Sequence, residues 1–440
     1  MVIEGWLDRA ASRAPERIAL ETPAVSWTYA ELAGLARLGA QQLAERGAGP
    51  GERVAIALPP GADFVVALHS CLALGAVAVP VDLRLAAGEQ ERITAGAAVL
   101  LDEPLPTEGG WAWPAVRHDL DAPALIVHTS GTTSGARPVS LTYGNLLWSA
   151  LGSGVALGVE ADERWLCALP LAHVGGLSIL LRSAIYATTA VVHERFETDR
   201  VLAALRGGGV SIVSLVATTL ARLLDAGLER PPALRCALTG GGPVGRSLLE
   251  RAHAAGVPVS LTYGLTEACS QVTTTPAAEL AAAPASAGPP LFCTRVALAE
   301  DGEILVSGPT VSPSAALQDG RLATGDLGRL DEDGRLSVTG RKADTIISGG
   351  ENVAPAEVEA VLEAHPAVLE AAVVGRPDER WGERVSALVL ARPGARIDAE
   401  ELLEHCRRAL APYKVPREIM ARDEPLPRTA SGKLLRRELA

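Results

Sequence analysis

The chain has 440 residues, of which 48% are hydrophobic and only 3% aromatic. We therefore expect roughly two to four domains or subdomains, with cores built mainly from Ala, Val and Leu. Forty Lys and Arg against 52 Asp and Glu give a formal net charge of −12, which argues against nucleic acid or an anionic membrane surface as the main partner.

Cysteine usage and the N-terminus predict a reduced, cytoplasmic protein. The six cysteines are scattered without a C-x-x-C pair, which is typical of buried thiols in a reducing compartment. The first residues lack a basic segment followed by a long apolar one, so no signal peptide is expected. No charge-free apolar run reaches membrane-spanning length, so no integral membrane segment is expected.

The first part of the chain alternates between short apolar strands and amphipathic helices. Thr28 fits a helix N-cap, and Glu31 completes a capping box for a helix that runs through Gln42. Further strands are predicted at 18–20, 25–27, 53–58 and 77–81, and further helices at 5–13 and 62–74. This alternation favours a parallel sheet with helices on its faces.

A loop rich in glycine and hydroxyl groups, Thr129 to Gly135, follows a predicted buried strand at 124–128. Such a loop presents several backbone N–H groups and several O–H groups to one anion, with no bulky side chain in the way. We therefore favour a phosphate cradle over the alternative, a polar surface loop.

The alternation of strands and helices resumes after this loop and contains two candidate ligand-binding residues. His173 follows a predicted strand at 165–170, at the kind of strand end where open α/β sheets bind ligands. A core histidine with satisfied hydrogen bonds is an equal alternative. Arg182 lies in an apolar helix predicted at 176–186. Its guanidinium either snorkels to solvent, which is the commoner outcome, or faces an anion in a pocket.

Two further strand ends carry candidate groups. Gly240 and Gly241 follow a predicted strand at 235–239 and would let a flat ligand lie against bare backbone, or form only a tight turn. Glu267 follows a strand at 257–261. Its carboxylate suits Mg²⁺, which prefers carboxylate and phosphate oxygens; an ordinary salt-bridged glutamate is the alternative.

The rest of the chain divides into a β-rich segment and a small α+β domain. Short strands with Asp-Gly turns predict a β-rich subdomain at 276–339, within an N-terminal domain of residues 1–339. In this subdomain, Asp326 would accept hydrogen bonds from a ribose diol or cap a turn. A C-terminal domain is predicted at 340–440. Its basic tail carries Lys433, which either reaches into a cleft or belongs to a solvated charge run.

The joint order of these motifs resembles the acyl-adenylate-forming superfamily of acyl-CoA synthetases, peptide-synthetase adenylation domains and firefly luciferase. The matching motifs are Thr129-Ser130-Gly131-Thr132-Thr133, Tyr263-Gly264-Leu265-Thr266-Glu267, Thr324-Gly325-Asp326, Gly340-Arg341, Ser348-Gly349-Gly350-Glu351-Asn352 and Ser431-Gly432-Lys433. The resemblance covers essentially the whole chain. It implies an α/β fold with stacked α/β subdomains and a small β-barrel-like unit, followed by a mobile α+β C-terminal lid domain.

The resemblance also implies a two-step reaction. A carboxylate attacks the α-phosphate of ATP and releases pyrophosphate, and the thiol of coenzyme A then displaces AMP from the acyl-AMP. The nucleotide- and CoA-binding residues implied are Thr129, Ser130, Gly131, Thr132, Thr133, Arg137, Gly240, Gly241, Tyr263, Gly264, Thr266, Asp326, Arg341, Ser348, Gly349 and Gly350. Glu267 and Thr133 would hold Mg²⁺. The catalytic residues implied are Lys433, Glu267, Thr132 and His173.

The resemblance implies that Lys433 stabilises the anionic, in-line transition state of the first step. The resemblance implies that the C-terminal domain turns about a hinge near Ala343 between the two steps. The face formed by Ser348 to Asn352 would then replace Lys433 and line the thiol channel.

Within the superfamily, the chain is similar to the o-succinylbenzoate–CoA ligases of menaquinone synthesis. The likeness rests on residues 169–177, 182–186 and 263–271 and on the short chain. The implied substrate carries an aromatic ring, a ketone and two carboxylates. One carboxylate is activated, and the other needs a cation or hydrogen-bond donors. The substrate-binding residues implied are His173, Arg182, Gly264 and Ser270.

The phosphate loop departs from the family pattern. Where the family usually has Gly-x-Pro-Lys-Gly, this chain has Ser134-Gly135-Ala136-Arg137-Pro138, and the forked Arg137 is not equivalent to lysine. The alternatives are another aryl- or medium-chain acyl-CoA ligase, a stand-alone adenylation protein that loads a carrier protein, and a non-catalytic AMP-binding homologue. Retention of Glu267, Asp326, Arg341 and Lys433 argues against the last. A homodimer stays open.

Overall fold

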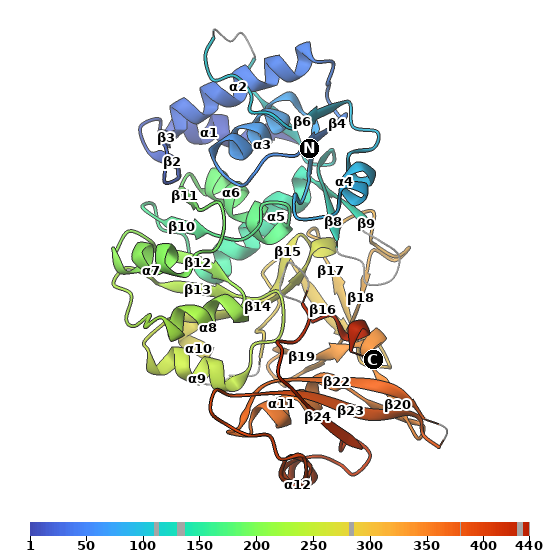
Figure 1. Cartoon of the computed structure of the whole chain (residues 1–440). Coiled ribbons are helices and arrows are strands. Elements are labelled where there is room, and N and C mark those ends of the chain that lie inside the picture. The colour runs from blue at the N-terminus through green and yellow to red at the C-terminus, as the bar shows by residue number, and fades with distance from the viewer. Residues whose placement is uncertain (110–113, 130–136, 281–285, 379, 429–433, 440) are drawn as a thin grey trace. The chain divides into compact units, whose positions relative to one another are not determined.

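The computed structural model describes residues 1–109, 114–129, 137–280, 286–378, 380–428 and 434–439. The chain forms two compact units. The first comprises Met1–Gly241, Arg251–Val296 and Val306–Leu322, and the second comprises Gly242–Glu250, Ala297–Leu305 and Ala323–Ala440. Both units mix helices with sheets (Figure 1), so the predicted α/β class is confirmed. The domain boundary at residue 340 stays a prediction.

An eight-stranded sheet in the first unit has the order β15-β14-β13-β12-β10-β11-β2-β3 (Figure 1). Its strands are Ser270–Thr275 (β15), Val259–Leu265 (β14), Cys236–Thr239 (β13), Ile212–Leu215 (β12), Arg164–Cys167 (β10), Thr189–Val192 (β11), Ile18–Glu21 (β2) and Ser26–Thr28 (β3). The six central strands are parallel, and the two edge strands are antiparallel to their neighbours. Parallel neighbours need crossover helices, which places helices against the sheet.

The helices of this region are Tyr143–Leu157 (α5), Val174–Tyr186 (α6), Thr198–Arg206 (α7), Ala217–Asp225 (α8), Arg246–Ala254 (α9) and Ala277–Leu280 (α10). α5 and α6 pack on each other and on β15. α5 begins at Tyr143, where Thr142 and Asn145 cap it reciprocally. Asn145 N–H donates to the Thr142 hydroxyl at 3.1 Å, and Thr142 N–H donates to Asn145 Oδ1 at 2.9 Å.

A second sheet of the first unit has the order β6-β4-β5-β8-β9. Its strands are Val99–Leu101 (β6), Arg53–Ile56 (β4), Val77–Pro80 (β5), Pro123–Thr129 (β8) and Arg137–Thr142 (β9). The helices that connect or flank them are Trp6–Arg13 (α1), Tyr29–Glu45 (α2), Ala62–Leu74 (α3) and Ala87–Thr94 (α4). The first four strands are parallel, whereas β9 turns back antiparallel to β8. The predicted capping box of α2 is confirmed by reciprocal Thr28–Glu31 hydrogen bonds.

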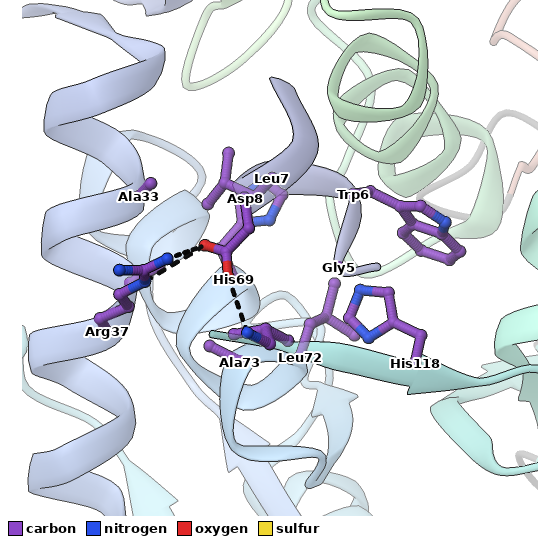
Figure 2. A pocket seen from close by; sticks show the side chains of 12 residues that line it. Gly5, Trp6, Leu7, Asp8, Ala33, Arg37, His69, Leu72, Ala73 and His118 are labelled. Atoms are coloured by element: carbon purple, nitrogen blue, oxygen red, sulfur yellow. Dashed lines mark hydrogen bonds and ion pairs between the residues drawn. The ribbon is translucent and has the colours of Figure 1, made fainter. Parts of the chain in front are cut away.

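A buried polar cluster ties α1 to α2 (Figure 2). Asp8 accepts hydrogen bonds from Arg37 Nη2 at 2.9 Å and from the Val116 backbone N–H at 2.7 Å. Strands Val2–Glu4 (β1) and Arg117–Asp119 (β7) pair beside it. His69 and His118 line a cavity of about 20 Å³ with this cluster, which is room for one water molecule. Burial lowers the pKa of each histidine to about 4, so both rings are neutral.

Two sheets contribute to the second unit. One has the order β16-β17-β18-β19, with strands Arg295–Leu298, Glu303–Ser307, Leu322–Leu330 and Leu336–Arg341. The other contains Glu351–Val353 (β21), Ile346–Ser348 (β20), Gly382–Ala391 (β23), Val368–Asp378 (β22) and Glu418–Arg422 (β24). Helices Pro355–Glu363 (α11) and Ala399–Ala409 (α12) pack on β22 and β24, respectively. Apolar residues of both helices and of this sheet form one core.

Within the described ranges, no helix is both long enough and apolar enough to cross a bilayer. In that same part of the chain, no three His, Cys, Asp or Glu side chains are grouped so that they could hold a metal ion. The cysteines form no disulfide there, and all but the half-buried Cys293 are buried, as the sequence predicts.

Candidate active site

The predicted phosphate loop lies between β8 and β9, which pair with each other antiparallel. Thr129 ends β8 and pairs with Arg137, the first residue of β9, and the Thr129 hydroxyl donates to the Arg137 carbonyl at 3.4 Å. Ser130, Gly131, Thr132 and Thr133 lie outside the described residues, so their predicted roles stay predictions. The sequence predicts the strand before the loop but not the antiparallel return strand after it.

Ser312 joins this hairpin to the turn that carries Glu267. Its backbone N–H donates to the Glu267 carbonyl at 2.8 Å, and its hydroxyl donates to the Ser140 carbonyl in β9 at 2.6 Å. The short helix Thr266–Ala268 (η1) therefore lies against β9. The sequence motifs do not predict this role of Ser312. The one feature of the sequence that marks the position is a short stretch with serines at 312 and 314.

Glu267 has the chemistry of a magnesium ligand. Its side chain is half-buried, and its carboxylate accepts no hydrogen bond from the rest of the described chain. One carboxylate suits Mg²⁺ when substrate phosphates and water supply the other oxygens. The second predicted ligand, Thr133, lies outside the described residues.

The ends of β13 and β14 bring the predicted adenine-binding residues together. Gly240 follows β13, and a Cβ there would lie 2.7 Å from the Thr262 carbonyl of the neighbouring strand. Gly241 has φ +81°, a left-handed conformation that favours glycine. Tyr263 follows Thr262 in β14. Gly240, Gly241 and Tyr263 therefore lie together at the carboxyl ends of the neighbouring strands β13 and β14.

Gly264 is required for the turn around Glu267. A Cβ on Gly264 would lie 1.6 Å from the Ser270 carbonyl oxygen of β15, a distance that no packing adjustment accommodates. Gly264 therefore allows β14 and β15 to approach each other, and the two strands hold Thr266 and Glu267 at the sheet edge between them.

Arg182 lies beneath this turn. Its side chain is 3% exposed, so it does not snorkel. Nη2 donates to the Ser149 hydroxyl at 3.1 Å, and that hydroxyl donates to the Cys269 carbonyl at 2.6 Å. The guanidinium also lies 5.7 Å from the Trp165 ring centre. Across the described residues, Nε has no hydrogen-bond partner and no carboxylate pairs with Arg182. Burial lowers the pKa of Arg182.

His173 is held at the N-cap of α6 by charged neighbours. Its Nε2 lies 3.3 Å from Arg84 Nη2 and 3.5 Å from Asp82 Oδ2. Burial acts to raise the pKa of Asp82, but the hydrogen bonds from Arg84 outweigh it and hold that pKa well below its usual range. The ring is 30% exposed, so His173 is neither a core histidine nor freely solvated.

The two substrate-binding candidates on α6 lie at different depths. Nine residues separate His173 from Arg182, which places them about 13 Å apart along the helix axis and on opposite faces. A single carboxylate therefore contacts one of them directly, and the two assignments are alternatives. Arg182 shares the Cys269 turn with the third candidate, Ser270, whereas His173 does not.

The second unit brings Asp326 and Arg341 together. The two residues are register partners in β18 and β19, and Arg341 Nε lies 3.0 Å from Asp326 Oδ1. Asp326 is buried and Arg341 is half exposed. Gly325, with φ +72°, donates its N–H to Glu303 and fixes the turn that precedes Asp326.

The predicted thiol-channel residues form a tight hairpin between β20 and β21. Gly349 and Gly350 have φ +62° and +86° between the paired residues Ser348 and Glu351, the pattern of a two-residue type I′ turn. A Cβ on Gly349 would lie 2.7 Å from the Trp381 ring. Both glycines therefore have structural reasons for their place in the hairpin.

Ion pairs flank the predicted hinge residue Ala343 on both sides. Lys342 Nζ lies 2.5 Å from Asp301 and 2.9 Å from Glu303. Asp344 lies 3.3 Å from Arg436, which also binds Glu359 at 2.7 Å. The sequence did not single out these partners. Lys433 lies outside the described residues.

The chain matches the family model of AMP-binding enzymes over residues 7–102 and 93–314. It also matches the model of the AMP-binding enzyme C-terminal domain over residues 357–433. The chain belongs to the AMP-binding enzyme family, as the sequence motifs predict.

Named relatives place it within that family. The 2-succinylbenzoate–CoA ligase of Bacillus subtilis (strain 168) is 40% identical, with 99% of this chain and 97% of the relative covered. The ligase of that name from Geobacillus kaustophilus is also 40% identical, with 99% and 96% covered. The structure of o-succinylbenzoate CoA synthetase (MenE) from Bacillus subtilis with the acyl-adenylate OSB-AMP is similar at a TM-score of 0.91 and 37% identity, covering 100% of this chain and 98% of that one. The same enzyme in complex with ATP and magnesium ion is similar at a TM-score of 0.90 and 37% identity, with both chains fully covered.

Proposed function

We propose that this chain is an AMP-forming acid–thiol ligase that converts o-succinylbenzoate to o-succinylbenzoyl-CoA, a step of menaquinone synthesis. Full-length relatives with this name support the proposal. The structural observation that supports a dicarboxylic acid as the substrate is the environment of Arg182. This side chain is a buried cation with no carboxylate partner among the described residues. A dicarboxylic acid brings a second carboxylate that fits such a cation, because a buried charge is costly unless it is paired.

In the first step, a carboxylate oxygen of the acid attacks the α-phosphorus of ATP, and the bond to the β-phosphate oxygen breaks. The hairpin loop between Thr129 and Arg137 binds the phosphates, with Thr132 and Ser130 as hydroxyl donors. Gly240, Gly241 and Tyr263 bind the adenine at the sheet edge where the structure gathers them. Arg182 holds the non-reacting carboxylate, and Gly264 and Ser270 line the acid beside it.

Glu267 and Thr133 are the residues that would hold magnesium, which neutralises phosphate charge when bound. The half-buried carboxylate of Glu267, next to β9 and free of other partners in the described chain, fits an oxygen-seeking cation. This chain's own part is to place that carboxylate beside the phosphate hairpin, which Ser312 does through its two hydrogen bonds.

The C-terminal residues serve both steps. Asp326 and Arg341 bind the ribose, and the Lys433 ammonium stabilises negative charge on the in-line transition state. We further propose that the domain from residue 340 turns about Ala343 before the thiol of coenzyme A attacks the acyl carbon and AMP leaves. The Ser348–Gly349–Gly350 hairpin then lines the thiol channel. A homodimer and a cytoplasmic location stay predictions.

Product analysis tests the proposal. The whole chain is incubated with ATP, Mg²⁺, coenzyme A and o-succinylbenzoate, and the products are followed by mass spectrometry. We expect AMP, pyrophosphate and the o-succinylbenzoyl thioester. A panel of aryl and medium-chain acids, with and without a carrier protein, is run alongside. Faster turnover of another acid, or transfer only to the carrier, would replace the proposed substrate or acceptor. Absence of ATP–pyrophosphate exchange with every acid would make the chain a binding protein.

A further inference from the structure

Asp82 and Arg84 form a rigid pair two residues apart, directly after β5. Asp82 accepts hydrogen bonds from the Arg84 backbone N–H at 3.1 Å, from Nε at 2.8 Å and from Nη2 at 2.6 Å. Three bonds between the same two residues hold the guanidinium fork in one orientation. The Asp82 side chain is 12% exposed and Arg84 41%, so the pair is anchored at its acidic end and reaches outward at its basic end.

The outer end of this pair meets His173. Arg84 Nη2 lies 3.3 Å from His173 Nε2, although the two residues are 89 positions apart in the sequence. A guanidinium only donates hydrogen bonds, so Nε2 has to accept, and the proton of a neutral ring then resides on Nδ1. Asp82 Oδ2 competes from 3.5 Å, because it would accept a hydrogen bond from a protonated Nε2. The nearer group is the Arg84 donor.

His173 lies at the N-cap of α6. In the described residues, Asp82 and Arg84 are the charged side chains that contact the ring. Nδ1 has no hydrogen-bond partner there, which leaves its N–H available to a ligand.

We propose that Arg84, held by Asp82, is a positioning residue that fixes neutral His173 with its proton on Nδ1. Nδ1–H then donates to an oxygen of the acid substrate or of its adenylate. The second half rests on the proposed ligase function, whereas the first half concerns the ligand-free protein alone. Arg182 meanwhile binds the distant carboxylate, which accounts for the separation of the two residues along α6.

The ring state is measured directly by NMR. The chain is labelled with ¹⁵N-histidine, and long-range ¹H–¹⁵N spectra are recorded without ligand at about pH 8.5, above the ordinary titration range of histidine. The His173→Gln variant identifies the His173 signals among the eight histidines. We expect the wild-type ring to be the Nδ1–H tautomer. Arg84→Met removes the donor and leaves Asp82 as the remaining charged partner, so we expect a switch to the Nε2–H tautomer.

A matched pair elsewhere in the chain supplies the control. Arg321 binds Asp319 with the same two-residue spacing, through its backbone N–H and its Nε, at 3.0 and 2.6 Å. Arg321→Met breaks an equivalent pair away from His173. We expect it to leave the His173 tautomer and the Michaelis constants unchanged. Thermal unfolding of each variant shows whether the chain still folds.

Steady-state kinetics link the ring to the substrate. We expect Arg84→Met to raise KM for the acid about tenfold, the value of one hydrogen bond, with KM for ATP unchanged. A wild-type Nε2–H tautomer, or a ring that Arg84→Met leaves in the Nδ1–H state, would overturn the positioning role. If the tautomer switches but KM for the acid stays constant, the donation to substrate is wrong. The NMR result decides the first half even if no acid is ever turned over.

Discussion

Two arginines, one buried in the first unit and one half-buried in the second, have opposite surroundings. In the first unit, Arg182 is almost fully buried and donates to a neutral hydroxyl, Ser149, with no carboxylate beside it in the described chain. In the second unit, Arg436 binds both oxygens of Glu359, at 2.8 and 2.7 Å, and also contacts Asp344. Glu359 in turn accepts the Val373 N–H at 2.8 Å, so this group of charges is compensated within the protein.

The difference fits the proposed roles, a structural cation in the second unit and a substrate-binding cation in the first. A compensated pair such as Arg436 and Glu359 connects α11 to the C-terminal tail, and removing either partner leaves a charge stranded. A buried cation without a counterion costs stability, and that cost is offset only if an anion arrives. Four experiments test this contrast, in order of decreasing expected effect.

The largest effect is expected at Lys433, three residues before Arg436. If Lys433 is catalytic and Arg436 structural, Lys433→Ala should slow adenylation about 10³-fold, because one charge-stabilising donor is lost. Thioester formation from supplied acyl-AMP and the stability of the chain should be largely unchanged. ATP–pyrophosphate exchange measures the first half-reaction, and acyl-CoA release measures the second. Equal loss in both would contradict the turning of the C-terminal domain.

Arg436→Met should lower the free energy of unfolding more than Arg182→Met does. It strands the Glu359 carboxylate, which is 12% exposed, and should reduce the free energy of unfolding by about 3 kcal/mol. Denaturant unfolding of the whole chain, followed by hydrogen exchange of α11 amides, measures the loss. The double variant Arg436→Met with Glu359→Met should recover part of it. No recovery would show that the ion pair is not what Arg436 contributes.

Arg182→Met applies the same substitution to the uncompensated cation, with the opposite outcome. No carboxylate is stranded in the described chain, so the free energy of unfolding should change by less than about 1 kcal/mol. KM for o-succinylbenzoate should rise about 30-fold, with KM for ATP unchanged, because the distant carboxylate loses its partner. Initial rates with each substrate varied measure the split. A constant KM for the acid, or a stability loss as large as that of Arg436→Met, would make Arg182 structural.

The smallest effects concern pH, where the two units should respond with opposite signs. Burial lowers the pKa of His69 from 6.5 to about 4, so the unfolded chain binds more protons in that window and stability falls as the pH drops through it. Burial raises the pKa of Glu363 from 4.5 to about 7, so the folded state keeps the proton and stability falls as the pH rises through that window. Each full shift corresponds to at most about 3 kcal/mol over its whole window, so stability changes by at most about 1.4 kcal/mol for each pH unit crossed.

Hydrogen exchange separates these two responses, since α3 reports on the first unit and α11 on the second. His69→Leu should reduce the loss of amide protection that α3 shows as the pH falls, and should leave the protection of α11 unchanged. Glu363→Gln, which keeps an oxygen for the Ala371 N–H, should flatten the loss in α11 at rising pH. Slopes of the same sign in both helices would contradict the assigned proton states.

Features that depend on residues close together in the chain could be predicted from the sequence. The Thr28–Glu31 capping box, the helix that ends at Gly75 and the strand before the phosphate loop follow from local hydrogen bonding and hydrophobic period. The family motifs likewise predicted the fold class and the AMP-binding family, because a series of short motifs in a fixed order is specific even where each motif alone is weak.

Contacts between side chains far apart in the chain became visible only in the folded structure. Ser312 meets Ser140 across 172 positions, His173 meets Arg84 across 89, and Arg436 meets Asp344 across 92. The sequence also left open whether Arg182 snorkels or lies enclosed, and the packing of α5, α6 and β15 encloses it. Hydrophobic periodicity and secondary-structure propensity depend on a residue's neighbours along the chain. The counterion and the burial of a side chain depend on which elements pack together in space.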